Sequence, residues 1–244
     1  MKITSICTLV VVLVMFLTAH VFAGDFASLH FIGFSKDGRY MAFEQFGTQD
    51  GSGFPYSNIY FIDTSKNAFA TTGVKVTVEN ESGKETTARA RSMALAAKKL
   101  RQFGIVKGNT GRLVISHLMT DQAFDGDPDD VKANNVKFYE ETQSMHHEGD
   151  YEINLTPVKN NIKACEGYGD DTFMIELKLT DHVADTIKLL QKDITIPASR
   201  GCALSYRIQD VYLYNNVIAV LMGVFTQGFE GPDMRFFAAA GTFK

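Results

Sequence analysis

The apolar and polar positions between Gly33 and Asp63 alternate between short hydrophobic runs and turn sequences, GFSKDGRYMAFEQFGTQDGSGFPYSNIYFID. Runs rich in aromatic and β-branched residues between Gly, Asp and Asn are typical of β-strands. Asp37-Gly38 fits a hairpin turn, because these residues tolerate the positive φ that such turns require. Residues 47–57 contain three glycines and a proline, and they predict a shaped loop rather than a strand. Including the run that begins at Leu29, this segment predicts three or four antiparallel strands.

Residues 82–104, SGKETTARARSMALAAKKLRQFG, change to a helical pattern rich in Ala, Arg, Lys and Leu. The apolar residues that share one helical face are Met93, Ala97, Leu100 and Phe103. Ser82 and Glu85 have the spacing of an N-terminal capping box, and Gly104 suits a C-terminal stop. The pattern predicts an amphipathic α-helix over about residues 84–103.

The rest of the chain consists of short β-compatible runs separated by turn-rich pieces, which suits an antiparallel meander. These runs are 112–117, 136–140, 149–155, 173–179, 186–192, 203–213, 217–225 and 235–243. Residues 181–191 satisfy neither period well, so a second helix there stays open. The fold class is therefore mainly β, either an antiparallel sandwich or incomplete propeller-like sheets, with one amphipathic helix.

The segment from Asp210 to Gly241 has the same order of strand, turn, strand, loop and strand as the first segment. Asn215-Asn216 stands where Asp37-Gly38 stands, and both loops contain Gln, Gly, Phe and Pro. Either an internal repeat or independent use of the same turn residues can explain this similarity. If the two segments pack side by side, the loops TQDGSGFPY and TQGFEGPD would share one surface.

The N-terminus has the features of a secretory signal peptide: Lys2, an apolar run from Ile3 to Leu17, and Val21-Phe22-Ala23 as a cleavage site. We expect cleavage after Ala23 and a periplasmic or secreted protein; an uncleaved anchor is the alternative. Residues 1–23 are then the signal peptide, and residues 24–244 form a single β-rich domain.

The chain carries 24 Lys and Arg against 28 Asp and Glu, a net charge of −4, and loss of Lys2 makes it −5. This balance argues against a nucleic-acid partner. The predicted helix is nevertheless basic. A solvated face explains this, and peripheral contact with an anionic membrane or an acidic partner through Lys98, Lys99 and Arg101 is the alternative.

Cys165 and Cys202 are the two cysteines outside the signal peptide, and in an exported chain such a pair favours a disulfide over two buried thiols. Neither has a CxxC motif or a nearby His, which argues against a catalytic thiol.

Candidate chemistry is otherwise sparse. The alternating Asp125, Asp127 and Asp129 resemble the start of a calcium loop, but the glycine and glutamate of that loop are missing, so a solvated turn is preferred. His146-His147-Glu148 lacks the HExxH spacing of a metal site, and we expect no cofactor.

No nucleophile motif or P-loop is present. A hydrolase would have to bring distant carboxylates together, and the candidates are Glu44, Asp50, Glu230 and Asp233. Turn capping or pairing with Arg39 and Arg235 is the simpler interpretation.

The two glycine-rich loops are the better candidates for binding, because large side chains lie beside flexible glycines. The binding candidates are Phe54, Tyr56, Gln227 and Phe229. Their aromatic rings could equally turn inward and fill the core.

The chain resembles a bacterial family of predicted secreted proteins, domain of unknown function 2259, in three stretches: residues 33–63, SRGCALSYRIQDV at 199–211, and GVFTQGFEGPDMRFFAAAG near the end. A weaker resemblance to TolB-like or WD-type propeller blades rests on FSKDGRYMAF. The family resemblance implies location but no activity or site residues. We therefore expect a non-enzymatic binding or scaffolding protein of the envelope, whose partner is an envelope protein or a glycan; an envelope hydrolase and a purely structural protein are the alternatives.

Overall fold

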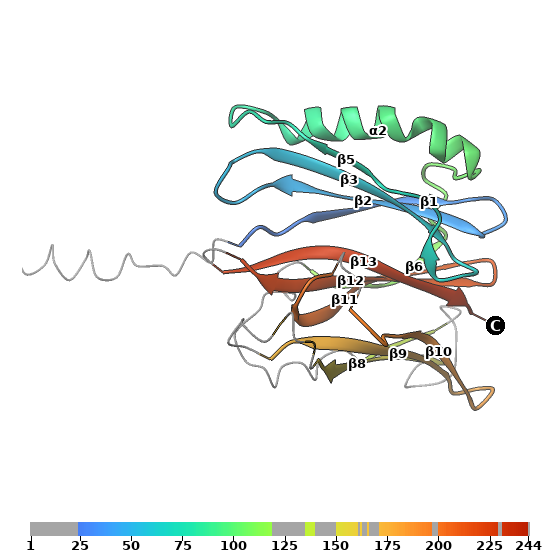
Figure 1. Cartoon of the computed structure of the whole chain (residues 1–244). Coiled ribbons are helices and arrows are strands. Elements are labelled where there is room, and N and C mark those ends of the chain that lie inside the picture. The colour runs from blue at the N-terminus through green and yellow to red at the C-terminus, as the bar shows by residue number, and fades with distance from the viewer. Residues whose placement is uncertain are drawn as a thin grey trace, which may run out of the picture.

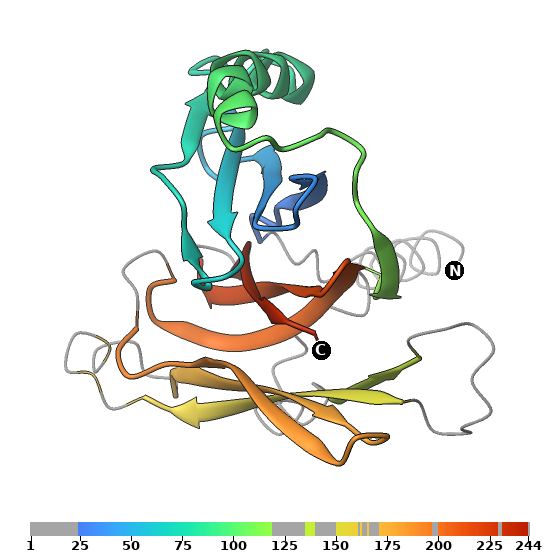
Figure 2. The ribbon, with the colours of Figure 1, turned by 90° about the vertical axis from the view of Figure 1, so that its right-hand side faces the viewer.

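The computed structural model describes residues 24–118, 135–139, 150–160, 162, 165, 171–196, 200–228 and 231–243. In these residues one helix and three antiparallel sheets stack in four layers (Figure 1). From the top of the view the layers are helix α2, an N-terminal sheet, a central sheet and an outer sheet, and Figure 2 shows the same order from the side. The mainly β fold class is confirmed. The sheets stack as in a sandwich and do not radiate from an axis as propeller blades do.

The N-terminal sheet contains the segment from Gly33 to Asp63. Its strands are β1 (Ser28–Phe34), β2 (Tyr40–Thr48), β3 (Pro55–Asp63), β4 (Ala68–Phe69) and β5 (Val74–Thr77). The order is β1-β2-β3-β4, and β5 also pairs with β3. The turn before β2 contains Gly38 at φ 76°, as the Asp-Gly pair predicts.

The central sheet has the order β13-β12-β11-β6. Its strands are β6 (Arg112–Ser116), β11 (Ala203–Tyr214), β12 (Val217–Gln227) and β13 (Pro232–Thr242). Both of its faces are covered: Leu221 and Phe225 pack against the N-terminal sheet, whereas Val220 and Met222 pack against the outer sheet. This explains why β12 is almost continuously apolar, since a strand buried on both faces has no solvent side.

The outer sheet has the order β10-β9-β8-β7. Its strands are β7 (Asn135–Phe138), β8 (Tyr151–Lys159), β9 (Phe173–Asp181) and β10 (Thr186–Lys192). In β8 the buried Tyr151, Ile153 and Leu155 alternate with half-buried polar residues, so only one face meets the core. The strand alternative for residues 186–192 is correct, and no second helix forms there.

Helix α2 (Glu85–Gln102) covers the N-terminal sheet and agrees with the predicted range. The predicted capping box is wrong: the N-cap is Lys84, and Glu85 Oε1 instead accepts a hydrogen bond from Thr48 Oγ1 at 3.2 Å. Gly104, at φ 63°, follows the helix as expected. The buried face consists mainly of small residues, Ala88, Ser92, Ala96 and Leu100.

The connection that leaves α2 crosses β1 at Gly33 before it enters β6 (green in Figure 2). The N–H groups of Val106 and Gly108 donate to the carbonyls of Phe34 and Ile32. A Cβ on Gly33 would lie 2.3 Å from the Val106 carbonyl oxygen, and its φ is +143°. Only glycine allows so close a crossing.

The first and last segments form similar meanders, β1-β2-β3 and β11-β12-β13, which pack face to face. Their short turns touch, because Tyr214 Oη and Asn215 Nδ2 both donate to the Lys36 carbonyl. Beside β1, Phe26 forms a parallel bridge with Met234 of β13. The two segments are therefore neighbours, although they belong to different sheets.

Asn67, in the turn before β4, joins all three sheets. Its Nδ2 donates to Leu190 O at 2.9 Å and to Gln191 Oε1 at 2.5 Å, both in β10. Its Oδ1 accepts from the N–H of Ala240 in β13 at 2.8 Å. The residue has φ 49°, a left-handed conformation that asparagine tolerates better than most residues.

Candidate functional site

The ends of the two glycine-rich loops meet at Asp25. The O–H of Tyr56, at the start of β3, donates to Asp25 Oδ1 at 3.3 Å, and the Asp25 N–H donates to Asp233 Oδ1 at 3.0 Å. Arg235 of β13 donates to both the backbone and the carboxylate of Asp25. Its guanidinium lies 4.9 Å from the centre of the Tyr56 ring. Both loops therefore lie at the same end of the stacked meanders, as side-by-side packing predicts.

Tyr56 is buried in this cluster and does not project from the loop. Burial raises the pKa of its hydroxyl well above the ordinary value, and the Asp25 carboxylate adds to this effect. The hydroxyl is therefore a permanent hydrogen-bond donor. The Tyr56 ring therefore turns inward and helps to fill the core, which is one of the two alternatives that the sequence left open.

A pocket of about 310 Å³ opens beside the cluster, on the face of the central sheet that turns toward the outer sheet; we call it the loop-end pocket. Its lining residues are Arg200, Gly201, Cys202, Val224, Thr226, Gln227, Arg235, Phe236 and Phe237. Apolar side chains of β12 and β13 thus meet two guanidinium groups, a hydroxyl and a carboxamide. A concave apolar site with a few convergent polar groups is the usual form of a small-molecule site.

One side of the pocket is fixed by a buried ion pair between Arg200 and Asp193. Arg200 Nη1 and Nη2 donate to the two oxygens of Asp193 at 2.7 and 2.5 Å. Burial of Asp193 opposes ionisation, but the hydrogen bonds from Arg200, Gln191 and the Ile175 N–H together with the Arg200 charge outweigh it and lower the pKa of the carboxyl. The Arg200 guanidinium also lies 4.7 Å from the centre of the Phe237 ring. This side chain is therefore held in place by the fold.

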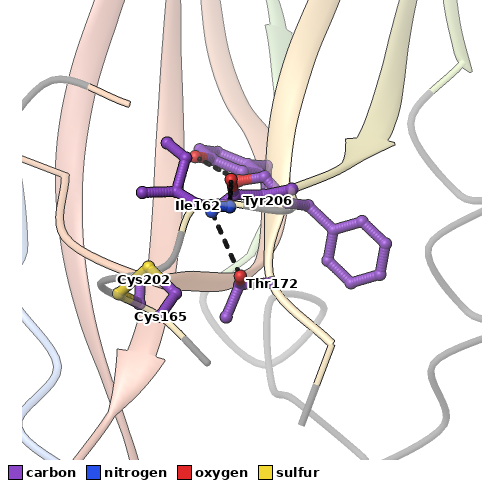
Figure 3. Close-up of a disulfide and its surroundings, with 7 residues drawn as sticks. Ile162, Cys165, Thr172, Cys202 and Tyr206 are labelled. Atoms are coloured by element: carbon purple, nitrogen blue, oxygen red, sulfur yellow. Dashed lines mark hydrogen bonds between the residues drawn. A yellow bond between two sulfur atoms is a disulfide. The ribbon is translucent and has the colours of Figure 1, made fainter. Parts of the chain in front are cut away.

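The disulfide Cys165–Cys202 holds the same wall (Figure 3). It joins the connection between β8 and β9 to the residues just before β11, so it links the outer sheet to the central sheet. Tyr206 lies near it, and burial raises the pKa of this tyrosine to about 12. The predicted disulfide is confirmed.

Arg235, on the other side of the pocket, has N–H donors that no acceptor among the described residues uses. A guanidinium has five N–H donors in two bidentate edges. The edge formed by Nη1 and Nη2 binds Asp25, and Nη1 also donates to Met234 O. Nε and the second proton of Nη2 have no acceptor in the described part of the chain. The side chain is 32% exposed and lines the pocket, so part of it is accessible there.

The chain matches the model of the family DUF2259, described as a predicted secreted protein, over residues 42–242. The chain belongs to this family. The match covers the helix, most of β2 and every described strand from β3 to β13, and it includes the lining of the pocket. No curated protein matches the chain.

The match to DUF2259 identifies a secreted protein but specifies no activity and no site residues. The weak likeness to a propeller blade gains no support from the family match or from the stacked sheets. Among the described residues, no helix has the length and apolarity needed to cross a bilayer.

Glu44, the first catalytic candidate, is buried between β2 and α2. Arg89 donates two hydrogen bonds to the Glu44 carboxylate, at 3.0 and 2.9 Å. Ser57 Oγ donates a third at 2.8 Å, and His30 Nδ1 lies 3.0 Å from Glu44 Oε2. Burial would raise the pKa of Glu44, but the hydrogen bonds from His30, Arg89 and Ser57 lower it to about 2. This carboxylate joins the helix to the sheet.

The other catalytic candidates do not gather around Glu44. Asp233 contacts Asp25 beside Tyr56, and Tyr56 and Ser57 are neighbours in β3 whose side chains point to opposite faces. Glu44 and Asp233 therefore lie on opposite sides of the N-terminal sheet. Asp50 is exposed in its loop, where Oδ1 accepts from the Gly51 N–H. Glu230 lies outside the described residues.

The binding candidates also separate. Gln227 is exposed and lines the pocket, Tyr56 is buried, and Phe54 is half-buried. Phe229 lies outside the described residues. The main functional residues that could not be recognised from the sequence are Asp25 and Arg200. Asp25 pairs with Arg235, 210 positions away, and Arg200 pairs with Asp193 in a stretch that matches no known motif.

The remaining candidates concern metals and the basic helix. Asp125, Asp127, Asp129 and the triplet at 146–148 lie outside the described residues. Within the described ranges, no three His, Cys, Asp or Glu side chains gather closely enough to hold a metal. On α2, Lys98 and Arg101 are exposed, whereas Lys99 turns inward and donates to Thr72 O at 2.5 Å.

Proposed function

We propose that the protein is a non-enzymatic binding protein of the bacterial periplasm, exported with cleavage after Ala23, and that the loop-end pocket is its binding site. The observation that carries this proposal is the free edge of Arg235 in a concave site that also contains Gln227. The description of the family as secreted supports the compartment. The separation of Glu44 from Asp233 makes hydrolysis by these two residues the weaker alternative.

The ligand follows from the chemistry of the lining. A planar guanidinium edge suits a carboxylate, because two parallel N–H donors match its two oxygens. Val224 and Phe237 supply apolar surface beside this edge, and the Thr226 hydroxyl and Gln227 carboxamide can add one hydrogen bond each. The pocket therefore suits a small amphipathic monoanion, such as the carboxyl-terminal residue of a peptide or an acidic sugar.

The pocket is small for a complete ligand. Ligand pockets commonly have volumes of about 300–1,000 Å³, and about 310 Å³ lies at the lower limit. The pocket thus suits the end of a longer molecule, with the remainder outside. An envelope peptide or glycan fits this description.

Isothermal titration of the mature chain with matched probes tests the proposal. N-acetylphenylalanine and glucuronate carry the carboxylate, whereas N-acetylphenylalanine amide and glucose are their neutral counterparts. We expect saturable binding of at least one acid and binding at least tenfold weaker for its neutral counterpart, since charge-assisted hydrogen bonds are worth about 1.5–3 kcal/mol.

Two glutamine variants locate the binding. Gln227→Ala should weaken the acid's binding several-fold, whereas Gln102→Ala, a matched change at an exposed position on α2, should leave it unchanged. If none of the four probes binds, or if both variants behave as the wild type does, the pocket is not the site. A purely structural role would then be the better account.

A further inference from the structure

Helix α2 is the outermost layer of the molecule, and its outer face is uncovered (Figures 1 and 2). The helix has 18 residues, which at 1.5 Å per residue make a rod about 27 Å long. It lies along the N-terminal sheet, so one whole side can meet a flat surface. This side is far from the loop-end pocket, which lies beyond the N-terminal sheet.

Cations follow the middle of this outer face. Its exposed residues have the spacing 4-3-4-3 that keeps side chains on one side of a helix: Thr87, Arg91, Ala94, Lys98 and Arg101. The side chains of Arg91, Lys98 and Arg101 form no ion pair or hydrogen bond within the described part of the chain. Lys99, which the sequence grouped with Lys98 and Arg101, belongs to the inner side through its bond to Thr72.

Apolar and small residues lie between the cations. Leu95 is 64% exposed and is the helical neighbour of Arg91 and Lys98. Ala90 and Ala94 are also exposed. Small side chains allow close approach, and Leu95 can enter the boundary between head groups and acyl chains as on other interfacial helices.

The acidic residues near this surface lie at the N-terminal end of the helix, away from the cations. Glu85 opens the helix, and Glu79 and Glu81 precede it; all three are near the N-terminal turn. From Thr86 to Lys107 there is no Asp or Glu. A docked helix would therefore approach an anionic surface with its C-terminal two-thirds.

We propose that this outer face of α2 docks on an anionic phospholipid bilayer. Three unpaired cations along one line, with an exposed leucine beside them, match a plane of lipid phosphates and an apolar layer beneath it. The length of the line also fits a plane, since Arg91 and Arg101 are about 15 Å apart along the helix. An acidic protein is the alternative partner, and the experiment separates the two.

The first test is co-sedimentation of the mature chain with vesicles of phosphatidylcholine alone or with about 30% phosphatidylglycerol, a composition chosen to give an anionic surface. Each basic residue near an anionic surface strengthens binding about fivefold. We expect binding to the anionic vesicles that weakens with salt, and about 100-fold weaker binding for the triple variant Arg91→Gln, Lys98→Gln, Arg101→Gln.

A matched triple variant controls for net charge. Lys36→Gln, Lys66→Gln and Lys159→Gln remove the same charge from exposed positions elsewhere and should change binding less than about fivefold. Both triple variants should keep the wild-type circular dichroism spectrum. Equal losses in the two variants, or no binding of the wild type to anionic vesicles, would overturn the proposal.

Tryptophan fluorescence gives a second and independent readout, because the chain contains no Trp. The emission of the Leu95→Trp variant should shift to shorter wavelength when anionic vesicles are added, since the ring leaves water. Ile187→Trp, at a site 67% exposed on the outer sheet, should not shift. A shift in the Ile187→Trp variant alone would place the contact on another face. An unmoved spectrum of the Leu95→Trp variant would exclude insertion of this face and contradict the proposal.

Discussion

Removing the Asn67 side chain should destabilise the whole stack, because its amide contacts β10 and β13 while its backbone belongs to the N-terminal sheet. Asn67→Ala deletes three hydrogen bonds, each worth about 0.5–1.5 kcal/mol, for a total of about 2–4 kcal/mol. Alanine must also adopt the φ of 49°, which costs about 1 kcal/mol more.

Two further variants divide this free energy of unfolding into its parts. Asn67→Gly loses the same bonds without the backbone cost, so it should be more stable than Asn67→Ala by about 1 kcal/mol. Asn67→Asp keeps an acceptor for the Ala240 N–H but loses the donor to both Leu190 O and Gln191 Oε1, and it places a carboxylate oxygen against these two acceptors. It should therefore be no more stable than the glycine variant.

Urea unfolding followed by far-ultraviolet circular dichroism measures these differences through the midpoint at a constant m-value. A glycine variant as stable as the wild type would refute the assigned role of the hydrogen bonds. Equal stability of the alanine and glycine variants would refute the backbone contribution. A lower m-value in all three variants would show that the sheets no longer unfold together.

Three other perturbations have defined outcomes. The pKa of Glu44 is lowered to about 2, so its ionised carboxylate contributes about 3 kcal/mol to the free energy of unfolding. This contribution is complete above the ordinary pKa near 4.5 and disappears as the pH falls toward 2. Glu44→Gln should therefore abolish this part of the acid dependence of the melting temperature, and an unchanged pH profile would contradict the assignment. Serine in place of both disulfide cysteines, 37 positions apart, should lower the free energy of unfolding by about 4 kcal/mol, and urea midpoints unaffected by reductant would count against this. Gly33→Ala should lower the melting temperature by much more than Gly51→Ala. A Cβ at Gly33 would lie 2.3 Å from the Val106 carbonyl oxygen, whereas a Cβ at Gly51 would meet nothing within 4 Å. Similar losses of melting temperature in the two variants would refute the steric argument.

The strands and the helix could be predicted from local pattern because their period and turn residues are local properties. Asp37-Gly38, Gly104 and the apolar run of β12 each mark an element correctly. The short strand β5 is absent from the predicted strands, although Val74, Val76 and Val78 alternate with polar residues. The capping box failed because Glu85 has a tertiary partner in Thr48, 37 positions away.

The stacking order and the candidate site could be predicted only in part. Gln227 was found because its loop composition is unusual, and the neighbourhood of the two loops followed from the similar segments. The pocket itself depends on Asp25, Arg200 and Arg235, which come together from opposite ends of the chain. The sequence shows that these charges exist but not that Asp25 uses only one edge of Arg235.

The packing of the first meander on the last has a consequence for the time course of synthesis. The inner face of the N-terminal sheet, with Phe31, Phe34 and Phe43, is covered by β11, β12 and β13. It therefore stays at least partly exposed until β13 has left the ribosome or the export channel. Complete packing of this sheet then waits for β13, and in that interval the sheet's aromatic face is the part of the nascent chain that a holding chaperone would have to cover.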